Sequence, residues 1–65
     1  MRISELTRRL RRIGMRRLRH GGQHDVWINP NNDNRASIPR HQNQEISERL
    51  VRKILGDLGL KREDL

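Results

Sequence analysis

Turn signals in the middle of the chain limit its fold more than any other feature of the sequence. Gly14, the pair Gly21-Gly22 and the run NPNNDN at 29–34 each favour a turn. Glycine and asparagine tolerate left-handed backbone, and proline lacks a backbone donor. Pro39 adds a fourth stop. The helical pattern is lost between these breaks, and we therefore expect short strands there.

Three strands are predicted, over residues 15–20, 24–29 and 35–39. Leu18 is the expected core anchor of the first strand. The second contains Val26, Trp27 and Ile28, whose β-branched and aromatic side chains favour strands. Because neighbouring residues of a strand point to opposite faces, we expect Val26 inside and Trp27 partly exposed. Two roles stay open for Trp27, a core residue or a platform on which a base stacks.

Amphipathic helices are predicted on both sides of the strands. The first covers residues 4–13, with Ser4 as N-cap and Gly14 as the stop. The second follows a loop over 43–46, begins after Ser47 as N-cap and ends at Gly59. Their apolar positions recur at spacings of three and four: Ile3, Leu6, Leu10 and Ile13, then Leu50, Val51, Ile54, Leu55 and Leu58.

The element order α-β-β-β-α indicates one α+β domain over residues 1–65, with two helices on one face of a three-stranded antiparallel sheet. Leu60 is expected to fold back after the second helix, and the tail KREDL to fray. Hydrophobic residues make up 31% of the chain, and cysteine is absent. A partner that adds buried surface would help so thin a core. No apolar run indicates a transmembrane helix or a secretory signal, so a soluble cytoplasmic protein is expected.

The charge of the chain points to a polyanionic partner. Its formal net charge is +7, and 13 of its 15 basic residues are arginine. Residues 1–20 contain eight arginines and a single acid, Glu5. The arginine fork matches the geometry of phosphate and stays charged at any relevant pH. Nucleic acid is therefore the expected polyanion.

Histidine is the residue type in this chain best suited to acid–base chemistry near neutral pH. The candidates are His20, His24 and His41. Their spacing gives no zinc site, since Gly21-Gly22 breaks any helix between the first two. RNA can be cleaved without a metal when its own 2′-OH attacks the adjacent phosphate, and a histidine can move the proton. His24 suits this role because it follows a glycine turn and begins a strand. A solvated strand-end histidine is the alternative interpretation.

Several segments in this order resemble the HicA toxin family, the small mRNA interferases of toxin–antitoxin pairs. They are the amphipathic helix ending in Gly, the basic strand, "GGQH", the apolar strand, "NPNN", "SIPRH" and "LVRKILGDLGL". The resemblance extends from Ser4 to Leu60. It implies a fold like that of a double-stranded-RNA-binding domain, which agrees with the order obtained from the residues. It also implies a HicB-type antitoxin partner that masks the active site.

The family's active-site histidine follows a glycine and one small residue, so the resemblance places this role on His24, in Gly22-Gln23-His24. Its Pro-Arg-His segment matches Pro39-Arg40-His41 and either positions RNA or fixes the entry to the second helix. Gln23 departs from the usual small hydroxyl residue, and Met15 stands where an aromatic residue often follows the glycine. Asp25 could orient an imidazole, but on an ideal strand it points away from His24.

The sequence therefore predicts an mRNA interferase that needs neither a metal nor another cofactor, with His24 as acid–base catalyst. The residues expected to contact RNA are Arg16, Arg17, Arg19, Gly22, Gln23, Trp27, Arg40 and His41. A non-catalytic RNA-binding module with the same fold is the main alternative. A third is a protein-interaction module whose basic face serves only an acidic protein.

Overall fold

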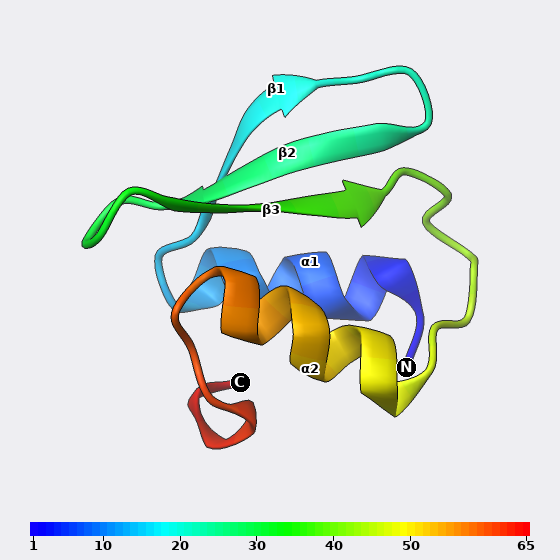
Figure 1. The fold of residues 1–65 in the computed structure, drawn as a ribbon. Helices are drawn as coiled ribbons and strands as arrows, with labels where there is room; N and C mark the ends of the chain where they lie inside the picture. The colour runs from blue at the N-terminus through cyan, green and yellow to red at the C-terminus, as the bar shows by residue number, and fades with distance from the viewer.

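The computed structural model describes residues 1–65 and has the predicted order of elements. They are α1 (Ile3–Arg12), β1 (Arg16–His20), β2 (His24–Asn29), β3 (Asn34–Pro39), α2 (Glu48–Asp57) and a short 3-10 turn, η1 (Arg62–Asp64). The three strands form one antiparallel sheet in the order β1-β2-β3. Both helices lie on the same side of it (Figure 1). The predicted α+β fold class is thus confirmed. Neither helix is long and apolar enough to cross a membrane.

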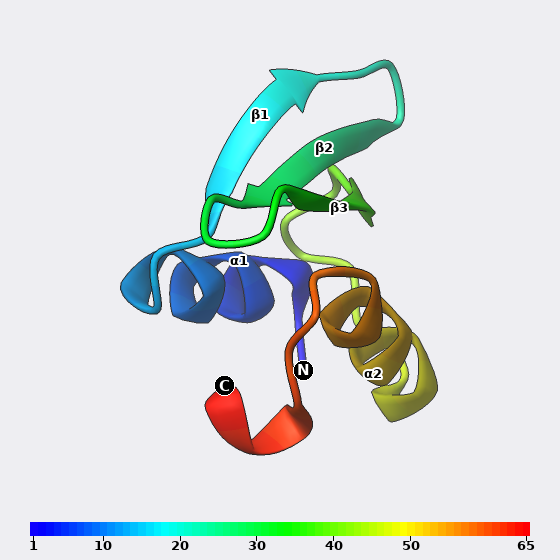
Figure 2. The same ribbon diagram turned by 60° about the vertical axis from the view of Figure 1, so that its left-hand side comes forward.

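The edge strand β1 carries a bulge that changes the expected role of Leu18. Arg17 pairs with Trp27 and Arg19 pairs with Val26, so Leu18 has no residue opposite it. Every residue of β1 is exposed, and Leu18 is 48% exposed. The prediction that Leu18 anchors the core was therefore wrong. A bulged residue on an edge strand has neither a cross-strand neighbour nor a covering layer to bury it, and β1 runs away from the helices from its start near α1 (Figure 2).

The face of the central strand β2 that packs on the helices is the one that bears Trp27. Asp25, Trp27 and Asn29 are buried, whereas Val26 and Ile28 between them are only half-buried. The prediction of a partly exposed Trp27 was therefore wrong, because its side chain is 2% exposed and belongs to the core. Apolar residues occur on both faces of β2, so local alternation could not decide which face the helices cover.

Helix α1 begins one residue earlier than predicted, and Ser4 is not its cap. The N-cap is Arg2, which makes no side-chain capping hydrogen bond. The loop before α2 satisfies the first backbone donors instead: Ile3 N–H donates to the Gln44 carbonyl and Ser4 N–H to the Gln42 carbonyl, both at 2.9 Å. Capping by a segment distant in sequence has no local signal. The predicted stop is confirmed, since Gly14 has a φ of 97°.

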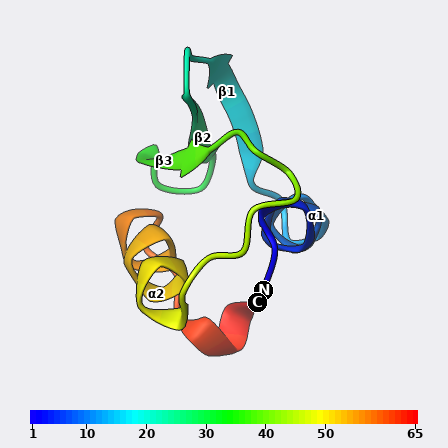
Figure 3. The same cartoon turned by 90° about the vertical axis from the view of Figure 1, so that its right-hand side faces the viewer.

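Helix α2 has the predicted cap and stop. Ser47 Oγ accepts the Leu50 N–H at 3.1 Å, and Gly59 has a φ of 74°. Leu60 folds back so that its N–H donates to the Leu55 carbonyl at 2.8 Å. The tail, which we expected to fray, forms η1, and Arg62 Nε lies 2.8 Å from a carboxylate oxygen of Glu48. In end view, α1 and α2 lie side by side under the sheet (Figure 3).

Candidate nucleic-acid interface

The pairing of the strands divides the predicted site residues between two faces of the sheet. Residues paired across antiparallel strands share a face. Arg17 pairs with the buried Trp27, and His20 pairs with the buried Asp25, so both belong to the face that the helices cover. Arg16 and Arg19 pair with Ile28 and Val26 on the opposite, open face. His24 is exposed and precedes Asp25, and strand alternation places it on the open face too.

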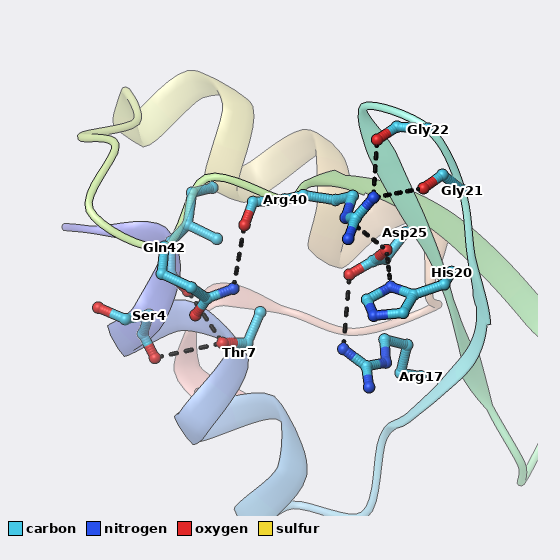
Figure 4. A network of polar contacts seen from close by, with 10 residues as sticks. Ser4, Thr7, Arg17, His20, Gly21, Gly22, Asp25, Arg40 and Gln42 are labelled. Carbon is cyan, nitrogen blue, oxygen red and sulfur yellow. Dashed lines mark hydrogen bonds and ion pairs between the residues drawn. The ribbon is translucent and has the colours of Figure 1, made fainter.

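The turn that precedes His24 is held in one shape by Arg40. The Arg40 Nη1 group donates to the Gly21 carbonyl at 2.8 Å and to the Gly22 carbonyl at 2.9 Å (Figure 4). The Arg40 backbone N–H donates to the Gln23 carbonyl at 3.1 Å. Gly21 cannot be replaced without movement, because an added Cβ would collide with the His24 carbonyl oxygen, whereas Gly22 has open space. The backbone that presents His24 is therefore fixed.

The side chain of His24 lies at the end of this turn with no hydrogen-bond partner from the chain. Beside the turn is a shallow hollow of about 350 Å³, lined by Gly22, Gln23, Arg40 and His41. All four are residues that the sequence placed at the RNA site. The structure thus brings this group together near His24, while Arg17 and Trp27 belong to the covered face.

A buried carboxylate organises the covered face near the same end of the sheet. Asp25 has a side chain that is 7% exposed, and its Oδ1 lies 2.7 Å from His20 Nδ1. Arg40 Nε is 3.6 Å from Oδ1, and Arg17 Nη1 is 3.7 Å from Oδ2 (Figure 4). Burial raises the pKa of Asp25, but the hydrogen bond and charge of His20, the Gly21 amide and the Arg40 charge outweigh it. The net pKa is below the ordinary value, so Asp25 is a carboxylate at neutral pH.

Sequence reasoning missed the partner of Asp25. It identified Asp25 as able to orient an imidazole and placed it on the face opposite His24. The imidazole that it contacts is that of His20, one of the three histidine candidates but not the one assigned to catalysis. The signal was present in the hairpin: strands joined across residues 21–23 bring His20 and Asp25 opposite one another.

Between α1 and β1 lies a groove of about 530 Å³ that contains this cluster. The residues that line it are Ser4, Thr7, Arg8, Arg11, Arg17, His20, Asp25, Trp27, Pro39, Arg40 and Gln42. Arg11 holds its guanidinium 5.2 Å from the centroid of the Trp27 ring, within the range of a cation–π contact. No three His, Asp or Glu side chains in the chain are grouped so that they could hold a metal ion.

Comparison with known proteins gives one match. The family model described as "HicA toxin of bacterial toxin-antitoxin" matches residues 3–60. The matched segment contains both helices, the whole sheet, the His24 turn and the groove. No curated protein and no solved structure matches.

Proposed function

The chain belongs to the HicA family of toxins from bacterial toxin–antitoxin systems, and we propose that it acts as an endoribonuclease on mRNA. One observation carries the proposal beyond family membership. An exposed histidine stands at the first residue of β2, at the end of a turn whose carbonyls are held by Arg40. Fixed backbone beneath a solvent-accessible imidazole supports a role in general acid–base catalysis, in which the ring comes within hydrogen-bond reach of the reacting proton.

The reaction needs no metal. The RNA 2′-oxygen forms a bond to the adjacent phosphorus while the bond from phosphorus to the 5′-oxygen breaks, which leaves a 2′,3′-cyclic phosphate and a 5′-hydroxyl. One proton leaves the 2′-OH and another reaches the 5′-oxygen. His24 carries one of these transfers.

The arginines near His24 differ in what they can offer the phosphate. Arg40 has hydrogen bonds from its Nη1 to two carbonyls, so it holds the turn and contributes charge. Arg16 and Arg19 are exposed on the open face that His24 shares, with no ion-pair partner in the chain. They are the cations that would hold flanking phosphates there, since guanidinium groups match phosphate oxygens in geometry.

Toxins of this family pair with an antitoxin, and a HicB-type protein is the partner that we assign to this chain. The open face bears Val26 and Ile28, both half-buried, and the adjacent edge strand β1 is exposed along its whole length. An edge strand offers unpaired backbone groups, and the net charge of +7 favours an acidic partner. A protein seated there would cover His24 together with Arg16 and Arg19.

Cleavage of RNA in EDTA by the purified protein, compared with His24→Ala, tests the activity. We expect the wild type to cut RNA and to spare a 2′-deoxy linkage, and the folded variant to be inactive. His41→Ala is the comparison variant: it removes another exposed imidazole, one that lines the hollow and is expected to contact RNA, so it should weaken binding but retain cleavage. Equal cleavage by wild type and His24→Ala would remove His24 from the mechanism.

The non-catalytic RNA-binding module is supported by a separate observation. His24 has no group that orients its ring, whereas His20 is held at 2.7 Å by a carboxylate. If the exposed His24 were only a strand-end residue, RNA affinity would be the same in wild type and His24→Ala, and neither would cut.

A further inference from the structure

We propose that the groove between α1 and β1 is a second RNA site, which binds a backbone phosphate of the same strand that reaches His24. Arg8 and Arg11 are its phosphate ligands from α1, and His20 is its ligand from β1. The inference rests on the proposed function in one respect, that RNA is the ligand. It differs in location, because the groove opens on the covered side of the sheet and His24 lies on the open side.

Two of the arginines in the groove lack a counterion. Four arginines and His20 line it, against one carboxylate, Asp25. That carboxylate already contacts His20, Arg17 and Arg40. Arg8 and Arg11 form no ion pair. Arg9 on the same helix, by contrast, pairs with Glu5 at 2.6 Å. Like charges gathered in a concave site raise the local concentration of anions.

A buried donor beside the groove also lacks a partner. Trp27 is 2% exposed and is the one hydrophobic residue that lines the groove. Its Nε1 atom has no hydrogen-bond partner. An indole N–H is a donor only, and leaving it unsatisfied in the interior costs free energy. A ligand oxygen that reached Nε1 would satisfy this donor, and the missing partner is an observation independent of the arginines.

His20 is placed to contact a ligand there. Its Nδ1 faces Asp25 at 2.7 Å, and the hydrogen bond fixes the orientation of the ring. The side chain is 54% exposed, so part of the ring is accessible to a ligand. When the imidazole is protonated, its Nε2–H can donate to a phosphate oxygen. Asp25 then acts as the positioning residue, since it contacts the imidazole and is itself 7% exposed.

Arg40 connects the two sites. It lines the groove, and it also lines the hollow beside His24 together with Gln23 and His41. A single strand that passes over Arg40 at the end of the sheet can therefore place one phosphate near His24 and another in the groove. Regularly repeated phosphates on a flexible backbone fit such a divided site better than carboxylates on a folded protein, and this favours RNA.

Trp27 supplies the readout, because it is the only tryptophan in the chain and it lines the groove. The probe is a short single-stranded 2′-O-methyl RNA, which has no free 2′-OH and cannot be cleaved by this route. We expect its binding to change the Trp27 fluorescence of wild type and of His24→Ala alike. Binding should weaken with salt.

The decisive comparison is Arg8→Gln with Arg12→Gln. Both remove one exposed arginine from α1, but only Arg8 lines the groove. Arg8→Gln should reduce the slope of log affinity against log salt by about one, as expected for a lost phosphate contact, and should weaken binding more than Arg12→Gln does. His20→Gln should weaken binding in the same direction. Circular dichroism of each variant checks its fold.

Several results separate this inference from the proposed function. If Arg8→Gln and Arg12→Gln weaken binding equally, the groove is not a phosphate site, even when RNA is cut at His24. If the groove variants lose affinity and no RNA is cut, the second site stands and the catalytic proposal fails. If Arg8→Gln and Arg12→Gln bind RNA with equal affinity but Arg8→Gln binds an acidic antitoxin more weakly, the groove binds a protein and the inference is overturned.

Discussion

His20 and His24 lie at the same end of the sheet, yet their surroundings differ in almost every respect. His24 is exposed on the open face, and its ring has no hydrogen-bond partner. His20 lies on the covered face, held by a carboxylate that is 7% exposed, in a groove with four arginines. The sequence motif indicates His24 as the catalytic residue, whereas the contacts identify His20 as the histidine whose ring is held in place. A motif locates a residue type at a turn, whereas contacts show which ring is oriented and which charges surround it.

The largest expected effect comes from replacing each of these two histidines in turn, which tests their assigned roles directly. His24→Ala should reduce kcat/KM for RNA by about 10²- to 10⁴-fold, the usual contribution of a general acid or base. His20→Gln should act mainly through binding, and raise KM with a smaller change in kcat. Steady-state kinetics on a defined RNA, with both variants measured at one salt concentration, gives the two parameters. Loss of kcat in His20→Gln with full activity in His24→Ala would reverse the assignment of catalyst and ligand.

Asp25→Ala is expected to destabilise the fold, because it leaves cations around an empty buried position. Removing one partner of a fully buried ion pair costs about 3–5 kcal/mol. The cations here are roughly half exposed, so we expect about 1–3 kcal/mol after allowance for solvent screening. Urea unfolding measures it. His24→Ala serves as the control and should stay within about 0.5 kcal/mol of wild type. Equal stability of the two variants would show that the cluster contributes nothing.

The same carboxylate predicts how stability depends on pH. The folded-state pKa of Asp25 is below its ordinary value, so its contribution is complete above about pH 4 and is lost as the pH falls through the folded value. Unfolding experiments should therefore show that the free energy of unfolding decreases as the pH falls below about 4. This decrease should be smaller in Asp25→Asn than in wild type. The N-terminal ammonium of Met1 lowers the pKa of Glu45 and Arg62 lowers that of Glu48, but both carboxylates are exposed and should contribute less.

Local signals in the sequence were sufficient for most of the fold. Gly14 and Gly59 end the helices, and Ser47 begins α2, because a left-handed residue or a side-chain cap acts within one turn. Ser4 is not the N-cap of α1, because backbone carbonyls of the distant loop before α2 accept the first N–H groups of the helix. The candidate corner at Gly22, Gln23 and His24 followed from a short motif and a resemblance, both of which are contiguous in sequence.

The groove could not be predicted in the same way, because it depends on facts that are not local. The burial of Trp27 required knowing which face of β2 the helices cover. The exposure of Leu18 required a bulge in the pairing of β1 with β2. The contact between His20 and Asp25 required the hairpin register, and the contribution of Arg8 and Arg11 required α1 to lie beside β1.

Two neighbouring glycines provide a matched test of the rigid turn at His24. Gly21→Ala should destabilise the protein by about 1–2 kcal/mol and lower the activity, since its Cβ collides with the His24 carbonyl oxygen. Gly22→Ala should stay within about 0.5 kcal/mol, because nothing lies near its Cβ. Thermal unfolding and RNA cleavage of both variants check this. Similar behaviour of the two would mean that the turn does not control the position of His24.

Leu18→Ser has the smallest expected effect on the isolated protein and distinguishes the open face from the groove. Leu18 is 48% exposed at a bulge, so its replacement should change the free energy of unfolding by less than about 0.5 kcal/mol. Binding of the 2′-O-methyl RNA in the groove should also be unchanged. If the antitoxin covers β1 and the open face, Leu18→Ser should lower the affinity of the protein for the antitoxin, as measured by titration calorimetry. Arg8→Gln and Arg12→Gln should then have about the same affinity for the antitoxin. The opposite pattern would place the antitoxin in the groove and leave RNA only the corner at His24.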